Sequence, residues 1–335
     1  MAIKIVVLGT GRIGRMHAEY LAHRVDEAEV AGVFDVNTEA ARAVSEQLGC
    51  PLALTLEEAL SLEADAVAIA TSTDTHVEMM QAAADAGRAI FVEKPISLDL
   101  NQVDDALAKI ESSGVLVQVG FNRRFDPSHR AVAQAVKAGV VGDVHLCHIT
   151  SRDPGPPPIE YIKVSGGIFC DMMIHDFDMA RYVVGSEVTS VYATGGVLVD
   201  PAIGEAGDLD TAVAVLTHEN GATTTITNSR KAVYGYDQRV EVFGSEGMVA
   251  SDNHTDHQTK VATAAGFAGA PLQHFFLERY TQSYLDQWSV FCRSVEAGDQ
   301  QSEVTGADGR RPLLMGLAAW KSVREGRPVL LTEIA

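Results

Sequence analysis

The chain has 335 residues, more than a single hydrophobic core ordinarily organises, so its length predicts two domains. With 26 basic and 45 acidic residues it carries a net charge of −19, and an acidic surface repels nucleic acid. No stretch has the run of about 18 apolar residues that a membrane helix needs, and the N-terminus lacks the pattern of a signal peptide. We therefore expect a cytoplasmic protein that binds neither nucleic acid nor membrane. The four scattered cysteines fit a reducing compartment: Cys50, Cys147, Cys170 and Cys292.

From the first residue to about residue 120, short apolar runs alternate with longer stretches of helical periodicity. The expected strands are Ile3–Leu8, Glu29–Asp35, Ala66–Ala70, Ala89–Val92 and Val115–Val119. The expected helices are Ile13–His23, Thr38–Leu48, Thr75–Ala86 and Leu100–Ser112. This alternation predicts an α/β domain over residues 1–120, with a parallel sheet of the Rossmann type.

The pattern changes beyond Phe121 and predicts a second domain over residues 121–335. A helix at Ser128–Ala138 and a strand at Val144–Ser151 precede a proline-rich connector over 153–158. The expected strands that follow are Glu187–Thr194, Thr211–Thr217, Ala222–Ser229, Asp237–Phe243 and Gly247–Asp252. Their alternating pattern predicts an open, largely antiparallel sheet, followed by two helices at Tyr280–Ala297 and Pro312–Glu325.

A glycine-rich segment follows the first expected strand and opens a helix, which is the setting of a dinucleotide site. Its residues are Gly9, Thr10, Gly11, Arg12, Ile13 and Gly14. Glycines there permit a tight turn and a close approach of backbone N–H groups to a pyrophosphate. Asp35 ends the second expected strand, where a carboxylate binds the ribose of NAD and repels the phosphate of NADP. We expect NAD as cofactor; the alternatives are a glycine turn without ligand and an exposed turn aspartate.

Two further strand ends carry candidate residues. Thr71, Thr73 and His76 follow Ala66–Ala70 and are expected to contact the cofactor, although Thr73 or Asp74 could instead cap the next helix. Glu93 and Lys94 follow Ala89–Val92, at the sheet edge where doubly wound proteins bind ligands. We expect both near the cofactor and Lys94 also at the substrate, where an ammonium group stabilises a developing alkoxide.

Three motifs together resemble the glucose-fructose oxidoreductase and inositol dehydrogenase (Gfo/Idh/MocA) family. They are the glycine fingerprint, Glu93-Lys94-Pro95, and the run from Gly166 to Asp178, and the resemblance extends over essentially the whole chain. Within the family, the segments Gly120–Asp126 and His175–Arg181 look most like inositol 2-dehydrogenases. The resemblance implies a homotetramer that oxidises a ring hydroxyl of an inositol, such as myo-inositol, with NAD.

The resemblance places the catalytic set on Lys94, Asp171 and His175. Asp171 and His175 are four residues apart, so on an α-helix their side chains share a face. A carboxylate there would orient the imidazole and favour its cation as it takes the hydroxyl proton. Outside a site of this kind, such a pair is more often a satisfied core histidine. Lys94, Asp171 and His175 are also expected to bind substrate, together with Arg124, Asp178 and Tyr236, and Arg123 competes with Arg124 for that role.

Several alternatives stay open at this stage. Ser151-Arg152-Asp153-Pro154 stands where better-known inositol dehydrogenases often have a histidine before Arg-Asn-Pro, which leaves the preferred isomer undecided. Another polyol or sugar dehydrogenase of the same fold would share every catalytic residue, and a non-catalytic sugar sensor is a rival of a different class. No metal is expected, because His145 and His148 on a strand point to opposite faces.

Overall fold

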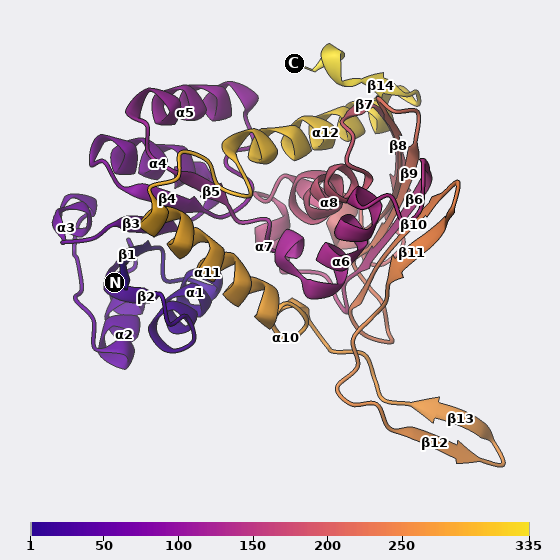
Figure 1. Ribbon diagram of the computed structural model, residues 1–335, viewed down its shortest axis with the longest axis horizontal. Helices are drawn as coiled ribbons and strands as arrows, with labels where there is room; N and C mark the ends of the chain where they lie inside the picture. Colours follow the sequence, from indigo (N-terminus) through magenta and orange to yellow (C-terminus); the bar gives the residue numbers. More distant parts are fainter. Residues whose placement is uncertain (1, 335) are drawn as a thin grey trace. The chain divides into compact units, whose positions relative to one another are not determined.

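Each of the two units of the chain is built around its own sheet (Figure 1). In the computed structural model, which describes residues 2–334, the first unit runs to Phe121 and resumes over Tyr284–Arg311. The second unit holds Asn122–Ser283 and the chain from Pro312 onward. The sequence predicted a single domain boundary, at residue 120. In the structure a later segment of the chain belongs again to the first unit. It returns because Trp288 and Phe291 are buried in the hydrophobic core of that unit.

The first unit has a five-stranded parallel sheet in the order β2-β1-β3-β4-β5. The strands are β1 (Ile3–Leu8), β2 (Ala28–Phe34), β3 (Ala66–Ile69), β4 (Ala89–Val92) and β5 (Val117–Val119). The central strand β3 is buried at every position, as strands covered on both faces are. The helices are α1 (Arg12–His23), α2 (Thr38–Leu48), α3 (Leu56–Ser61), η1 (Thr73–Thr75), α4 (His76–Asp85) and α5 (Leu100–Ser113). The predicted Rossmann-type domain is confirmed.

The second unit has a seven-stranded sheet in the order β11-β10-β6-β9-β8-β7-β14. Its strands are β6 (Val144–Arg152), β7 (Val188–Gly196), β8 (Thr211–His218), β9 (Thr223–Ser229), β10 (Asp237–Gly244), β11 (Gly247–Ser251) and β14 (Val329–Leu330). Only β6 and β9 pair in parallel, so the predicted, largely antiparallel sheet is confirmed. Buried and exposed positions alternate along β8, because one face of the sheet is covered and the other is open.

Helices of the second unit lie along one face of this sheet (Figure 1). They include η2 (Asn122–Phe125), α6 (Pro127–Lys137), α7 (Ile159–Ile162), η3 (Ile168–Met172), α8 (Ile174–Val184) and α9 (Pro201–Glu205). The element η3 is a π-helix, a form that is rare and frequent at functional sites. The C-terminal elements are α10 (Phe276–Arg279), α11 (Thr281–Ala297), α12 (Gly306–Glu325) and η4 (Leu331–Glu333).

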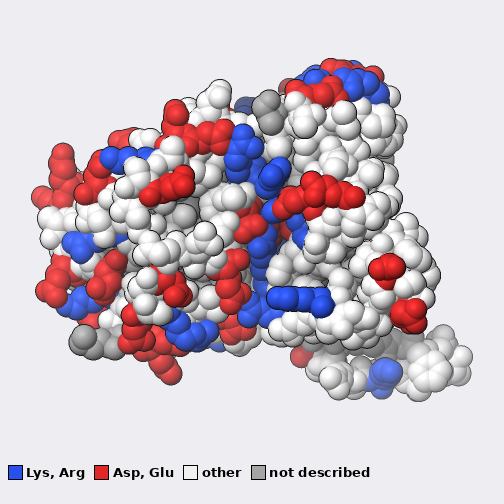
Figure 2. All heavy atoms as spheres, turned by 45° about the horizontal axis from the view of Figure 1, so that its top comes forward, with Lys and Arg blue, Asp and Glu red and all other residues white. Residues whose placement is uncertain are grey.

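A hairpin of β12 (Lys260–Thr263) and β13 (Gly266–Gly269) was not expected from the sequence. All of its residues are exposed, so no apolar alternation marks these strands. Acidic side chains are numerous on the face of the molecule shown in Figure 2, most densely in the left half of the view, in keeping with the net charge of −19. Within residues 2–334, no helix combines the length and hydropathy needed to cross a bilayer.

Candidate active site

The glycine turn after β1 has the shape of a phosphate cradle. Gly9 has a φ of +94°, and a Cβ on it would lie 2.5 Å from the Ala70 carbonyl oxygen. A Cβ on Gly14 would lie 2.0 Å from the Gly9 carbonyl oxygen, so the helix α1 packs against the turn itself. Gly11, in contrast, faces open space, with no atom within 4 Å of its Cβ position. It is the N-cap of α1, and no side chain caps the helix, so its first N–H groups face the space beside Gly11. The site therefore fits a dinucleotide pyrophosphate.

Asp35 lies beside this turn. Its Oδ2 accepts hydrogen bonds from the Thr10 backbone N–H, at 2.6 Å, and from the Thr10 hydroxyl, at 3.1 Å. Its Oδ1 accepts the Asn37 N–H at 2.8 Å. A carboxylate oxygen has two lone pairs, so these bonds orient the group and still leave acceptor capacity for a ribose hydroxyl. The geometry supports the cofactor role predicted for Asp35.

The turn after β3 is held by its own polar groups. The Thr75 hydroxyl donates to the Thr71 hydroxyl at 2.7 Å, and neither Thr73 nor Asp74 caps α4, whose N-cap is Thr75. His76 is buried, with Nδ1 2.9 Å from the Pro95 carbonyl oxygen and Nε2 3.2 Å from that of Thr71. Burial lowers the pKa of His76, so its ring is neutral and its single N–H donates to one of these two carbonyls at a time. Cofactor contacts of Thr71, Thr73 and His76 stay predictions, and the ring nitrogens of His76 face backbone instead.

Glu93 and Lys94 directly follow β4, at the carboxyl edge of the parallel sheet. The Glu93 backbone N–H continues the ladder to the Ile69 carbonyl at 2.9 Å, so the turn starts from a fixed strand end. Glu93 Oε1 lies 2.9 Å from Nε2 of His17, and Oε2 accepts the Lys94 N–H at 3.2 Å. This edge is where ligands bind in open α/β sheets.

In the second unit, Asp171 lies on the π-helix η3 and His175 in the first turn of α8, whereas one regular α-helix was expected for both. The Tyr161 hydroxyl donates to Asp171 Oδ1 at 2.8 Å. The buried Arg230 lies 3.7 Å from Asp171 Oδ2, measured from Nη1. Both Asp171 and His175 are partly exposed, so they are accessible from the surface of their unit. The arrangement provides an oriented carboxylate four residues before an accessible imidazole.

The structure pairs the predicted substrate residues Arg124 and Asp178 with each other. Arg124 Nε donates to Asp178 Oδ2 at 2.8 Å and Nη2 to Oδ1 at 2.6 Å, and both residues are buried. Arg123 likewise donates to Asp176 Oδ1, at 2.7 Å. Tyr236 is buried edge-on to the ring of Tyr280. These contacts build the core of the second unit, and substrate binding by Arg124, Asp178 and Tyr236 stays a prediction.

The segment that departs from the better-known inositol dehydrogenases also takes part in this core. The Ser151 hydroxyl donates to Asp176 Oδ1 at 2.6 Å and accepts from Arg123 at 3.0 Å. Asp153, two residues later, is partly exposed. Desolvation of its carboxyl group raises the pKa of Asp153 to about 7, although the positive charges of Arg123 and Arg230 act to lower it.

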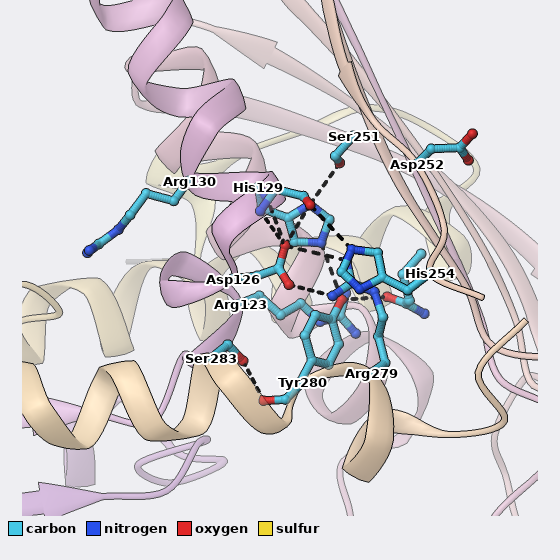
Figure 3. Close-up of polar contacts among 12 residues, drawn as sticks. Arg123, Asp126, His129, Arg130, Ser251, Asp252, His254, Arg279, Tyr280 and Ser283 are labelled. Atoms are coloured by element: carbon cyan, nitrogen blue, oxygen red, sulfur yellow. Dashed lines mark hydrogen bonds and ion pairs between the residues drawn. The ribbon is translucent and has the colours of Figure 1, made fainter. Parts of the chain in front are cut away.

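A buried polar network adjoins these residues (Figure 3). Asp126 pairs with Arg279, while the ring of His129 contacts the hydroxyls of Ser251, at 2.9 Å, and Tyr280, at 3.3 Å. Burial lowers the pKa of His129 to about 3, so its imidazole is neutral at ordinary pH. The network joins η2, α6, α10 and β11 and thereby holds the segment that carries Arg123 and Arg124.

Two family models cover most of the chain. The model described as "Oxidoreductase family, NAD-binding Rossmann fold" matches residues 3–121. The model described as "GFO/IDH/MocA C-terminal domain" matches residues 129–250. The chain belongs to the Gfo/Idh/MocA family. It is an oxidoreductase, and the predictions of the family, of an enzyme and of NAD as cofactor are confirmed.

Individual relatives of this family match over nearly the full length. The myo-inositol 2-dehydrogenase of Thermotoga maritima is 46% identical over 99% of both chains. The inositol 2-dehydrogenase of Rhizobium meliloti is 44% identical over 98% of this chain and 99% of its own. Among solved structures, the scyllo-inositol dehydrogenase of Lactobacillus casei with bound NAD(H) and scyllo-inositol has a TM-score of 0.92, with 28% identity over 99% of this chain and 100% of that one.

Sequence reasoning missed five residues that support the candidate groups: His17, Trp288, Tyr161, Asp208 and Arg230. His17 could have been noticed, because it lies on the helix opened by the glycine fingerprint. No sequence signal marks the others, since each meets its partner through the tertiary fold.

Proposed function

We propose that this oxidoreductase converts myo-inositol to its 2-keto derivative, with NAD as the hydride acceptor. The observation that carries the proposal is the 46% identity over 99% of the chain to a myo-inositol 2-dehydrogenase. It is supported by the position of Lys94 at a strand end and of Asp171 and His175 on consecutive helical turns. Bound NAD supplies the chemistry of hydride acceptance.

In the proposed mechanism, the side chains of this chain manage the proton and the charge. His175 takes the proton of the substrate hydroxyl as general base, and the carboxylate of Asp171 favours the resulting imidazolium. Tyr161 and Arg230 keep that carboxylate oriented. Lys94 donates a hydrogen bond to the reacting oxygen and stabilises its developing negative charge.

The test is an assay of NADH formation with a panel of myo-inositol, scyllo-inositol, D-chiro-inositol, glucose and xylose. We expect the highest kcat/KM with myo-inositol. A preference for scyllo-inositol or an aldose would show that the proposed substrate is wrong, while the proposed dehydrogenase activity would stand. No turnover with any of them would contradict the proposed activity and favour a sensor.

Lys94→Ala and His175→Ala test the catalytic assignment. Each should lower kcat by at least about a hundredfold while the affinity for NAD is retained, because an acid-base or charge-stabilising group is lost and the cofactor site is not. Calorimetric titration with NAD serves as the control. Wild-type turnover in either variant would remove that residue from the mechanism.

We also propose that the enzyme is a cytoplasmic homotetramer assembled through the open face of the second sheet. Met248, Phe243 and Leu146 are register partners on adjacent strands, so their side chains share one face, and all three are exposed. A contiguous apolar face of this kind is typical of an interface. Light scattering of the purified protein measures the assembly, and a monomeric mass would contradict it.

A further inference from the structure

A chain of three hydrogen bonds runs from a buried indole to the backbone of Lys94. Trp288 Nε1, on α11, donates to Nδ1 of His17, on α1, at 2.9 Å. His17 Nε2 lies 2.9 Å from Oε1 of Glu93, and Glu93 Oε2 accepts the Lys94 N–H at 3.2 Å. All four residues belong to the first unit.

The direction of each bond follows from its donors. An indole N–H can only donate, so His17 Nδ1 must accept and carries no proton. The single proton of a neutral imidazole is then on Nε2, from which it points at Glu93. Glu93 accepts at both oxygens, once from His17 and once from the backbone of Lys94, as a carboxylate does. Trp288 thereby selects the one tautomer of His17 that can orient Glu93.

Close packing restricts the side chains that make these three hydrogen bonds. The rings of His17 and Trp288 are fully buried, and His17 meets Phe91 and Tyr284 edge-on at 5.3 and 5.7 Å between centroids. A Cβ at Gly120 would lie 3.0 Å from the Glu93 carboxylate, so Gly120 leaves the room that this group occupies.

The turn is held on its far side as well. The Pro95 carbonyl lies 2.9 Å from Nδ1 of the buried His76. The residues directly before and after Lys94 are therefore both held by buried histidines, and the Lys94 side chain starts from a fixed backbone.

We propose that His17 and Trp288 are positioning residues for Lys94, acting through the carboxylate of Glu93. The inference rests on the proposed role of Lys94 in charge stabilisation. An ammonium group stabilises a transition state only from the correct position, and a displacement of about 1 Å can cost about a hundredfold in rate. A loosened turn should therefore slow the chemical step more than it weakens cofactor binding.

The matched test compares His17→Phe with His17→Gln. Phenylalanine keeps a ring in the aromatic cage but cannot donate to Glu93, whereas the glutamine amide offers an NH₂ group that donates and a carbonyl oxygen that accepts. We expect His17→Phe to lower kcat by about tenfold or more, with a larger isotope effect from deuterium at the reacting carbon of myo-inositol, and with KM for NAD within about twofold of wild type. His17→Gln should recover most of the rate.

Equal losses in both variants, or a folded His17→Phe enzyme with wild-type kcat, would overturn the inference. If His17→Phe does not fold, Trp288→Phe decides, because it keeps an aromatic ring in the core and removes the N–H that selects the tautomer together with part of the indole. Trp288→Phe should lower kcat, as His17→Phe is expected to do, and an unchanged kcat would count against the proposal.

A double-mutant cycle with Lys94→Ala separates this inference from the proposed function. If His17 acts through Lys94, His17→Phe has little further effect once the lysine is gone. Additive losses would overturn the positioning role while leaving the role of Lys94 intact. Wild-type turnover in Lys94→Ala alone would instead overturn the proposed function.

Discussion

The guanidinium of Arg230 lies 3.7 Å from the carboxylate of Asp171, the residue proposed to support the catalytic base. The same guanidinium donates from Nη2 to Asp208 Oδ2 at 3.1 Å. Asp208 Oδ1 in turn accepts the N–H of Ile168, the first residue of the π-helix that carries Asp171. One buried arginine thus holds both the carboxylate and the start of its helix.

Substitution of Arg230 should affect both stability and rate. Arg230→Met leaves Asp208 buried without its cation, which should cost about 3 to 5 kcal/mol in the free energy of unfolding, measured by urea denaturation. Arg230→Lys keeps a charge but loses the planar fork, so we expect a folded enzyme with kcat lowered by about tenfold. A methionine variant as stable as wild type would contradict the central place of this arginine.

Gly11→Ala should separate the cofactor site from the fold. Gly11 has a φ of −62°, which alanine adopts, and its Cβ position is open, so the melting temperature without NAD should stay unchanged. The added methyl group occupies space next to the helix N-terminus, and we expect the affinity for NAD to fall by about tenfold or more, about 1.4 kcal/mol. Gly14→Ala is the contrasting variant, since its Cβ would clash with the Gly9 carbonyl and destabilise the fold. Unchanged NAD affinity in Gly11→Ala would contradict the pyrophosphate site.

Asp35 should determine the choice between NAD and NADP. Its carboxylate is held beside the glycine turn by Thr10 and Asn37, where it would repel a ribose phosphate. We expect kcat/KM with NAD to exceed that with NADP by at least about tenfold, and Asp35→Ser to narrow the ratio chiefly by improving NADP. Equal efficiency of the wild-type enzyme with both cofactors would contradict this role.

His129 should make the fold sensitive to acid. Its pKa is about 3 in the folded protein, because of burial, and its ordinary value is 6.5, so the unfolded chain binds one proton more between these values. The contribution to stability is therefore complete above about pH 6.5 and is lost as the pH falls, by at most about 1.4 kcal/mol per unit.

Urea denaturation at several pH values tests this. His129→Asn removes the titrating ring, so its free energy of unfolding should fall less steeply than that of wild type between pH 7 and pH 5, while the two run parallel above pH 7. Parallel curves over the whole range would show that His129 does not titrate on unfolding.

The fold was largely predictable because its signals are local. The buried strands β3 and β4 are continuous apolar runs, β1 is apolar except at Lys4, and the helices between them follow their own periodicity. The hairpin β12–β13 and the return of α11 to the first unit were not predictable. The hairpin has no buried residues and so no apolar alternation to detect. The apolar periodicity of α11 predicts a buried helix face but does not indicate which unit covers it.

What the sequence determined by itself is therefore the Rossmann-type domain and the glycine turn with Asp35, since both depend on spacing along the chain. The resemblance to the family's motifs is what singled out Lys94, Asp171 and His175. Only the tertiary structure decided which groups hold them. His17 meets Trp288 across 271 residues, and Arg124 meets Asp178 across 54. Hydrogen bonds and buried ion pairs depend on distances of a few ångströms, and the folded backbone alone brings such distant residues together.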